Sequence, residues 1–277
     1  MNFMEKNMFI EKMEEKLKSL NIHFCVEQLE QFFVYMNLLI EWNEMMNLTA
    51  ITEPEEIILK HFIDSITILK DIEIEAKTQV QTIQMQTMQA QTQTQIEAET
   101  KMANKSKNNI ELVDVGTGAG FPGIPLSIMN PTLKITLVDS LNKRLVFLQE
   151  VINKLNLKNV ELVHARAEEF GQNKKYREKF DIATSRAVAN LSTLSEYLIP
   201  LVKIDGRVIS MKASDAQQEI DDAKNAIRIL GGKIEKVEEF NLPESDIGRT
   251  IIIIKKEKQT PNKYPRKPGT PSKEPIK

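Results

Sequence analysis

Apolar positions divide the chain into a helical first part and a mixed second part. In the first 72 residues they recur every three or four positions, which is the period of an amphipathic helix. We expect three helices, at about residues 8–20, around residues 29–40 and after Pro54. Thr52-Glu53-Pro54-Glu55 has the form of a capping box with proline in the first turn. The apolar positions of the last two helices are Leu29, Phe32, Phe33, Met36, Leu39, Ile40, Ile58, Phe62, Ile66 and Leu69.

From residue 110 onward, short apolar runs alternate with helical stretches. The expected strands cover residues 110–115, 134–139, 159–163, 180–185, 207–211, 233–240 and 249–255. The expected helices cover residues 123–130, 142–156, 190–201 and 214–230. Such alternation predicts an α/β fold, with a mostly parallel sheet and helices on both faces. Leu242-Pro243-Glu244 suggests a closing hairpin that makes one strand antiparallel.

A low-complexity segment separates the two parts. Residues 78–96 hold eight Gln, five Thr and no charged residue. Such a segment has little to bury, so we expect a disordered insertion at residues 75–108. The chain then divides into a helical region (1–74), this insertion, an α/β domain (109–258) and a basic tail (259–277).

Composition excludes several classes of protein. The single cysteine, Cys25, allows neither an internal disulfide nor a cysteine metal cluster. The N-terminus lacks the apolar segment of a signal peptide, and no apolar run approaches the roughly 18 residues of a membrane span. We therefore expect a cytoplasmic protein without membrane association.

Charge gives a local signal only. The net charge of −2 gives no overall sign of nucleic-acid binding. Residues 255–277, however, hold eight Lys or Arg against Glu257 and Glu274, a local charge of +6. Such a tail attracts phosphate or simply keeps the chain in solution.

The candidate chemistry lies where the first expected strand ends. Residues 112–123 read Leu-Val-Asp-Val-Gly-Thr-Gly-Ala-Gly-Phe-Pro-Gly, and the second strand ends on Asp139, 21 residues beyond Gly118. This is the layout of a βαβ nucleotide site, in which backbone approaches the ligand and the acid holds a ribose diol. A strand-terminal Asp that caps the next helix is the alternative for Asp139.

Three interpretations of this loop remain. Residues 118–123 fit the G-x-G-x-x-G pattern of dinucleotide enzymes. Together with Asp114, however, Gly116, Gly118 and Gly120 form D-x-G-x-G-x-G, which is more typical of class I methyltransferases that bind S-adenosylmethionine. A dinucleotide also needs a free helix N-terminus for its pyrophosphate, and S-adenosylmethionine has none. An ordinary tight turn is the third interpretation.

The chain resembles one family, the bacterial rRNA small-subunit methyltransferase G family, also called glucose-inhibited division protein B. The resemblance covers everything except about residues 75–108. Its motifs are Trp42-Asn43, Asn47-Leu48-Thr49-Ala50-Ile51, Lys60-His61-Phe62-Ile63-Asp64-Ser65, Gly120-Phe121-Pro122-Gly123-Ile124-Pro125-Leu126, Val138-Asp139-Ser140, Lys143-Arg144, Ala165-Arg166-Ala167-Glu168, Ser185-Arg186-Ala187 and Tyr264-Pro265-Arg266-Lys267-Pro268-Gly269-Thr270-Pro271.

The resemblance implies a class I S-adenosylmethionine-dependent methyltransferase. Its Rossmann-like domain would have a seven-stranded, mostly parallel sheet and a small helical N-terminal extension. The reaction it implies is methyl transfer to N7 of a specific guanine in 16S rRNA. The implied partner is 16S rRNA or the small ribosomal subunit, with an assembly intermediate as one form, and we expect no DNA partner.

The resemblance also assigns roles to single residues. It marks the positions of Gly116, Phe121 and Arg186 as cofactor-binding. It marks Ala167 and Glu168 as cofactor contacts, and this pair can supply the backbone N–H and the acceptor that recognition of adenine needs, although Ala-Glu-Glu is otherwise a common helix start. The complete set expected to bind cofactor is Gly116, Gly118, Gly120, Phe121, Asp139, Ala167, Glu168 and Arg186.

Further residues are candidates for substrate or catalysis. Arg186 ends the fourth strand, where its guanidinium would position the reactants, and a surface salt bridge is the alternative. His61, Asp64 and Ser65 share one helix face, which favours packing against the cofactor loop, contact with RNA or a simple hydrogen-bonded interface over a metal site. Lys212 and the tail residues Arg266 and Lys267 are weaker candidates for RNA phosphate, and we expect no metal.

Guanine N7 carries a lone pair and no proton, so its methylation needs no general base. Positioning and electrostatics would then supply the catalysis. The alternatives are a nicotinamide-dependent oxidoreductase, a non-catalytic RNA-binding protein on the same fold, and a methyltransferase for proteins or small molecules.

Overall fold

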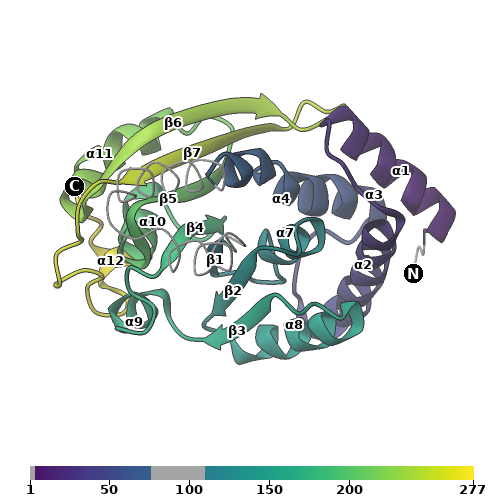
Figure 1. The fold of residues 1–277 in the computed structure, drawn as a ribbon, viewed down its shortest axis with the longest axis horizontal. Helices are drawn as coiled ribbons and strands as arrows, with labels where there is room; N and C mark the ends of the chain where they lie inside the picture. The colour runs from purple at the N-terminus through teal and green to yellow at the C-terminus, as the bar shows by residue number, and fades with distance from the viewer. Residues whose placement is uncertain (1–3, 76–109) are drawn as a thin grey trace, which may run out of the picture.

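A twisted sheet runs through the middle of the protein, in a computed structural model that describes residues 4–75 and 110–277 (Figure 1). The order of its seven strands is β3-β2-β1-β4-β5-β7-β6. Among these strands β7 alone runs opposite to the other six, as the predicted closing hairpin requires. The strands are β1 (Glu111–Val115), β2 (Lys134–Asp139), β3 (Val160–His164), β4 (Phe180–Arg186), β5 (Val202–Ala213), β6 (Gly232–Asn241) and β7 (Gly248–Lys256).

Side chains alternate between the two faces of the sheet, and each face buries its own apolar cluster. In β1, Leu112 belongs to one cluster and its neighbour Val113 to the other. The first cluster is covered by α7 (Gly123–Met129), α8 (Asn142–Leu155) and the N-terminal helices. The second is covered by α9 (Ala167–Gln172), α10 (Leu191–Leu198), a 3-10 turn (Ile199–Leu201) and α11 (Gln217–Leu230).

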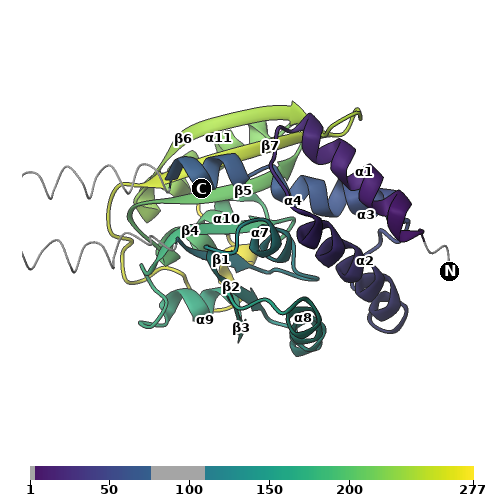
Figure 2. The same cartoon turned by 45° about the vertical axis from the view of Figure 1, so that its right-hand side comes forward.

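The N-terminal helices pack against the sheet domain (Figure 2). They are α1 (Lys6–Ser19), α2 (Val26–Met46), α3 (Pro54–Ile57), a π-helical segment (Ile58–Ile63) and α4 (Asp64–Ile66), and residues 69–75 are again helical. Phe9, Phe32 and Phe62 are fully buried where these helices meet. Their apolar stripe is therefore part of the main core.

Some details of the helices differ from the prediction. Glu53, not Thr52, is the N-cap of α3, and no side chain caps it, so the capping box does not form, although Pro54 does occupy the first turn. The helix predicted after Pro54 is π-helical in its middle, at Ile58–Ile63, and the six-residue α9 was not among the expected helices. Helix α9 is too short to produce a helical period of its own.

Residues 259–277 lie along the second face of the sheet domain and end near α12 (Thr270–Lys273), drawn in yellow in Figure 1. Tyr264 is buried in the second cluster. The predicted insertion at residues 75–108 lies, apart from residue 75, outside the described residues. Within the described ranges, no helix combines the length and apolar character needed to cross a bilayer.

Candidate active site

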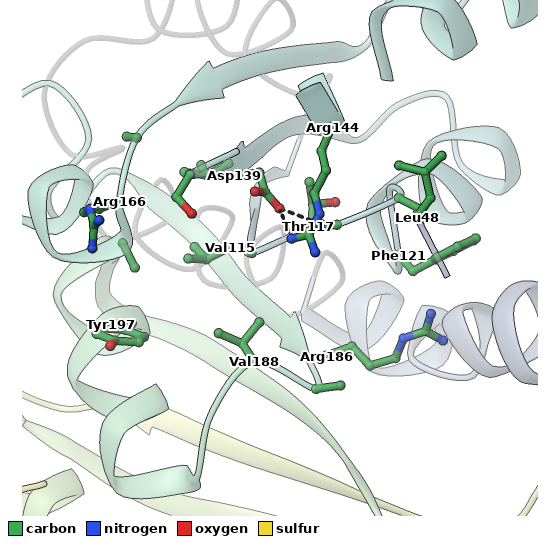
Figure 3. Close-up of a pocket in the computed structure, with 18 of the residues that line it drawn as sticks. Leu48, Val115, Thr117, Phe121, Asp139, Arg144, Arg166, Arg186, Val188 and Tyr197 are labelled. Carbon is green, nitrogen blue, oxygen red and sulfur yellow. Dashed lines mark hydrogen bonds and ion pairs between the residues drawn. The ribbon is translucent and has the colours of Figure 1, made fainter. Parts of the chain in front are cut away.

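A cavity of about 530 Å³ opens at the carboxyl ends of β1, β2, β3 and β4. Arg166 and Tyr197 lie at one end of it, Phe121 and Arg186 at the other, and Asp139 between them (Figure 3). Open parallel sheets bind ligands at this edge because the loops after the strands converge there. Seven of the eight residues predicted to bind cofactor line the cavity: Gly116, Gly118, Phe121, Asp139, Ala167, Glu168 and Arg186.

The remaining one, Gly120, does not line the cavity but packs against an N-terminal helix. A Cβ atom here would lie 2.8 Å from the phenol oxygen of Tyr35. At Gly118, by contrast, a Cβ would meet nothing within 4 Å, and the residue's φ of +62° is one that side chains disfavour. Gly118 therefore leaves backbone exposed to the cavity, whereas Gly120 makes room for Tyr35.

Backbone donors around the glycine loop are largely used within the protein. The amide of Gly118 donates to Asp139 Oδ2 (2.9 Å), that of Gly123 donates to Asp114 Oδ2 (3.0 Å) and that of Ile124 to the Gly120 carbonyl (2.7 Å). Since Gly123 begins α7 and Pro125 has no N–H, the first turn of that helix offers no free donor. A pyrophosphate would find no cradle here, which argues against the dinucleotide interpretation.

Asp139 is buried at the middle of the cavity and is already hydrogen-bonded. Its Oδ1 accepts from the amide of Leu141, the N-cap residue of α8, and its Oδ2 contacts Arg144 Nη1 at 3.2 Å. Because Leu141 is the N-cap of α8 and no side chain caps that helix, the alternative prediction that Asp139 caps it is wrong. Each carboxylate oxygen has two lone pairs, so Asp139 keeps the capacity to accept from a ligand hydroxyl.

Asp114, at the end of β1, is completely buried beneath the loop. Thr117 Oγ1 and the Gly123 amide both donate to its Oδ2, while its Oδ1 has no hydrogen-bond partner among the described residues. Burial raises the pKa of this carboxyl to about 6. An unpartnered buried carboxylate oxygen favours a cationic ligand nearby.

Arg186 joins β4 to the N-terminal helices. Its Nη1 donates to the Lys60 carbonyl (3.0 Å) and to Asp64 Oδ2 (3.1 Å), and Arg249 Nε donates to the other oxygen of Asp64 (2.9 Å). Asp64 is therefore shared by two arginines, and its side chain is 4% exposed. The alternative given for Arg186, a salt bridge at the surface, is wrong in its location. The ion pair of Arg186 with Asp64 is buried beside the cavity.

His61 sits between Arg186 and the cofactor loop. Its ring stacks on Phe121 with centroids 4.4 Å apart, as expected for packing against the loop. Because Arg186 Nη2 only donates, His61 Nδ1 (3.2 Å away) must accept, and the proton resides on Nε2, which faces Thr49 Oγ1 at 2.8 Å. Burial, followed by the charge of Arg186, lowers the pKa of His61 to about 3, so the ring is neutral at physiological pH.

A second cavity, of about 520 Å³, adjoins the first. The two share His61, Arg186 and Ala187. The second cavity lies toward the end of β5 and is rich in charge. Its remaining charged residues are Lys60, Asp64, Lys212, Asp215, Glu219 and Arg249.

The residues predicted to bind substrate do not all lie at one site. His61, Asp64 and Lys212 come together at the second cavity, but Lys212 Nζ is paired with Glu219 Oε1 at 2.5 Å, which satisfies its charge. Arg266 is ion-paired with Glu196 and lines neither cavity, whereas its neighbour Lys267 is exposed. Of these two tail candidates, only Lys267 is free to meet a phosphate.

Sequence reasoning missed several residues of the site. Thr49 lies within a motif of the resemblance but was given no role, and Tyr35, Tyr197 and Ser272 had no local signal at all. Over residues 4–75 and 110–277, no group of three or more His, Cys, Asp or Glu side chains is arranged to hold a metal ion.

Comparison with known proteins agrees with the predicted resemblance. The family described as rRNA small subunit methyltransferase G matches residues 28–83 and 83–247. Proteins named ribosomal RNA small subunit methyltransferase G are similar over nearly the whole chain. That of Acetivibrio thermocellus is 50% identical over 90% of this chain and 89% of its own length; that of Lactobacillus acidophilus is 49% identical, over 94% and 96%.

Solved structures of methyltransferases resemble the sheet domain more distantly. A 16S rRNA adenine-N1 methyltransferase from Catenulisporales acidiphilia, solved with S-adenosylmethionine, is 15% identical, with a TM-score of 0.46 over 61% of this chain and 95% of that chain. The strand order and pairing confirm the predicted seven-stranded, mostly parallel sheet. The chain belongs to the rRNA small subunit methyltransferase G family.

Proposed function

We propose that this protein transfers the methyl group of S-adenosylmethionine to N7 of a guanine in 16S rRNA of the small ribosomal subunit. The observation that carries the proposal is the junction of the two cavities at Arg186, His61 and Ala187. A donor held in the first cavity and a base held in the second would meet beside Arg186. Family membership supports rRNA as the class of substrate.

The residues of the first cavity fit the donor. When bound, S-adenosylmethionine supplies an electrophilic methyl group on a positively charged sulfur. The open backbone at Gly118 gives room for the methionine part, and the carboxylate of Asp139 can accept from the ribose hydroxyls. The free Oδ1 of Asp114 adds negative potential under the loop, where a cationic ligand benefits from it.

The chemistry at the junction suits a nucleophile that carries no proton. Guanine N7 has an in-plane lone pair, so its methylation requires alignment rather than a general base. His61, the imidazole nearest to the junction, is neutral and has Nδ1 turned toward Arg186. The protein's contribution is then to hold base and donor in line and to fix the charges around them.

The second cavity offers acceptors suited to guanine. Guanine presents N1–H and an amino group on the edge opposite N7, and the carboxylates of Asp215 and Glu219 line this cavity. Adenine has an acceptor, N1, in the corresponding position and would be disfavoured. Lys60 and Arg249 also line this cavity, each within an ion pair, with Glu56 and Asp64 respectively.

The geometry also restricts the RNA. In an A-form helix N7 faces a deep and narrow groove that protein side chains do not enter. The target guanine must therefore lie in an irregular or unstacked region. We expect a loop or distorted segment as substrate, presented by naked 16S rRNA, an assembly intermediate or the mature subunit.

The proposal is tested by incubating the protein with methyl-labelled S-adenosylmethionine and undermethylated small subunits. We expect ribonuclease-sensitive label at one guanine, and cleavage of the RNA there by the reduction and aniline treatment that detects N7-methylguanine. Naked rRNA and assembly intermediates, tested in parallel, identify the preferred form. Label in protein, or at another base atom, would overturn the proposal, and binding of NAD in place of S-adenosylmethionine would favour the oxidoreductase.

A further inference from the structure

The C-terminal segment, residues 264–272, reaches the cofactor cavity. Gly269 and Ser272 line that cavity together with Glu168 and Tyr197. Tyr197 lies at the end opposite Arg186 (Figure 3). The family model ends at residue 247, whereas the relatives that match nearly the whole chain also extend over this segment. The cavity is thus completed by residues that follow the last strand of the sheet.

One buried ion pair fixes the segment to α10. The side chain of Glu196 is completely buried, and Arg266 donates to it from Nε (2.9 Å to Oε1), Nη2 (2.7 Å to Oε2) and its backbone amide (2.7 Å to Oε1). A buried carboxylate requires such partners, because leaving it unpaired in the interior is costly. Arg266 is therefore an anchor, not a free cation.

Further contacts hold the chain on both sides of Arg266. Gln172 Nε2 donates to the Pro265 carbonyl (2.6 Å), and Thr193 Oγ1 donates to the Pro271 carbonyl (2.9 Å). Arg177 Nη1 donates to the carbonyl of Tyr264 (2.6 Å). Side chains of the sheet domain thus fix the path of the segment at several points.

The same segment is hydrogen-bonded to Glu168. The amide of Gly269 donates to Glu168 Oε1 at 2.8 Å, and the Glu168 side chain is buried. Tyr197 is close by: burial, and then the charges of Glu168 and Glu196, raise its pKa to about 12. A carboxylate accepts about four hydrogen bonds, so Glu168 retains acceptor capacity toward the cavity.

We propose that residues 264–272 form the wall of the adenine end of the S-adenosylmethionine site. In this arrangement Arg266 is a positioning residue: it anchors the segment so that the Gly269 amide orients Glu168 toward the exocyclic amine of adenine. The inference rests on the proposed function, because it takes the first cavity to hold S-adenosylmethionine.

The test compares two ligands that differ at that amine. S-adenosylhomocysteine carries it, whereas S-inosylhomocysteine has a carbonyl there, which a carboxylate repels. We expect calorimetry on the wild-type protein to give at least about tenfold tighter binding of the adenosyl ligand, the contribution of one buried hydrogen bond. The ratio of the two affinities should fall toward one in Arg266→Gln and in Glu168→Gln.

Two further variants test whether a fall in the affinity ratio has a purely structural cause. Lys267→Gln makes the same charge change at the exposed neighbouring position and should keep the wild-type ratio. If Arg266→Gln does not fold, the double variant with Glu196→Gln replaces the buried charge by a neutral pair and should show the same lost ratio. A wild-type ratio in a folded Arg266 variant would overturn the inference, even if both affinities fell equally.

The two proposals fail in different ways. A wild-type protein that binds neither S-adenosylhomocysteine nor S-adenosylmethionine would overturn the proposed function. A wild-type protein that binds both, but shows no preference for the adenosyl over the inosyl ligand, would overturn only the role of Glu168 and its anchor.

Discussion

The phenol of Tyr35, on α2, donates a hydrogen bond to the backbone carbonyl of Ala119, in the cofactor loop 84 residues further along the chain. Both residues are buried, and the Tyr35 ring packs beside Phe121 with centroids 5.5 Å apart. The N-terminal helices therefore support the floor of the cofactor cavity directly. They are part of the site and not an appendage to it.

Replacing Tyr35 by Phe should loosen this floor. The variant leaves the Ala119 carbonyl buried without its donor, so we expect unfolding free energy to fall by about 1–3 kcal/mol. Because burial holds the pKa of Tyr35 well above its usual range, the donor is protonated throughout the accessible pH range and the loss should not depend on pH. Denaturant unfolding and calorimetric titration with S-adenosylmethionine measure the two effects.

Tyr176→Phe is the matched control, since that ring lies against α9 and contacts Phe170 instead of the loop. It should leave cofactor affinity unchanged. Equal cofactor affinity in Tyr35→Phe and the wild type would show that the loop keeps its shape without the hydrogen bond.

The buried His61 predicts how stability depends on pH. Its pKa is lowered to about 3 in the folded protein, whereas an unfolded histidine has a pKa of about 6.5. Below pH 6.5 the unfolded chain binds a proton that the folded protein rejects, so stability falls as pH falls. At pH 5 the loss from this group amounts to about 2 kcal/mol.

The measurement is the unfolding free energy of wild type and His61→Gln between pH 7.5 and pH 5. Subtracting the two curves removes the contribution of the other titrating groups, and the difference should shrink as the pH falls. His164→Gln, at an exposed position, is the matched control. A slope unchanged by His61→Gln would contradict neutral burial of this ring.

Gly118 provides a direct test of the cavity. In Gly118→Val the side chain would extend into the space where a Cβ meets no protein atom, and we expect no heat of association with S-adenosylmethionine. The positive φ costs stability as well, by about 1–2 kcal/mol, so the variant should fold but melt at a lower temperature. Gly118→Ala carries the same backbone strain with less bulk and should bind weakly. Wild-type affinity in the valine variant would place the ligand elsewhere.

Much of the sheet was predictable because its strands are buried apolar runs. Observed β2 coincides with the predicted residues 134–139, and β1 and β4 differ from prediction by one residue at an end. Strand β5 begins five residues earlier than predicted, at Val202, because Lys203 and Asp205 interrupt its apolar pattern. A strand interrupted by polar and exposed positions near its start lacks the apolar run by which a strand is predicted from sequence.

The site was predictable where its residues follow strand ends and not where distant charges pair. Asp139 ends β2, the glycine loop follows β1 and Glu168 follows β3, so the topology brings them together. Arg266 reads in the sequence as part of a solvated basic tail, and nothing near it points to Glu196, 70 residues earlier. Such pairs are set by tertiary packing, which a local pattern does not contain.

The buried position of Arg186 decides which substitution tests it. Removing one partner of a buried ion pair typically costs about 3–5 kcal/mol of folding stability. In Arg186→Ala, a loss of turnover could therefore not be separated from a loss of folded protein. Arg186→Lys keeps the charge beside Asp64, which also retains its contact with Arg249. A lysine ammonium cannot reproduce the planar fork that contacts the Lys60 carbonyl, Asp64 and His61 together.

We therefore expect Arg186→Lys to remain folded, with kcat at least about tenfold lower, as the loss of one well-placed hydrogen bond at the transition state predicts. Single-turnover methylation of undermethylated subunits measures the rate, and thermal unfolding monitors the fold. Lys143→Arg exchanges the same two residue types at an exposed position of α8 and is the control. It should leave both the methylation rate and the unfolding temperature unchanged. Because Arg186 lies where the two cavities join, a lysine variant with wild-type kcat would mean that methyl transfer takes place away from that junction.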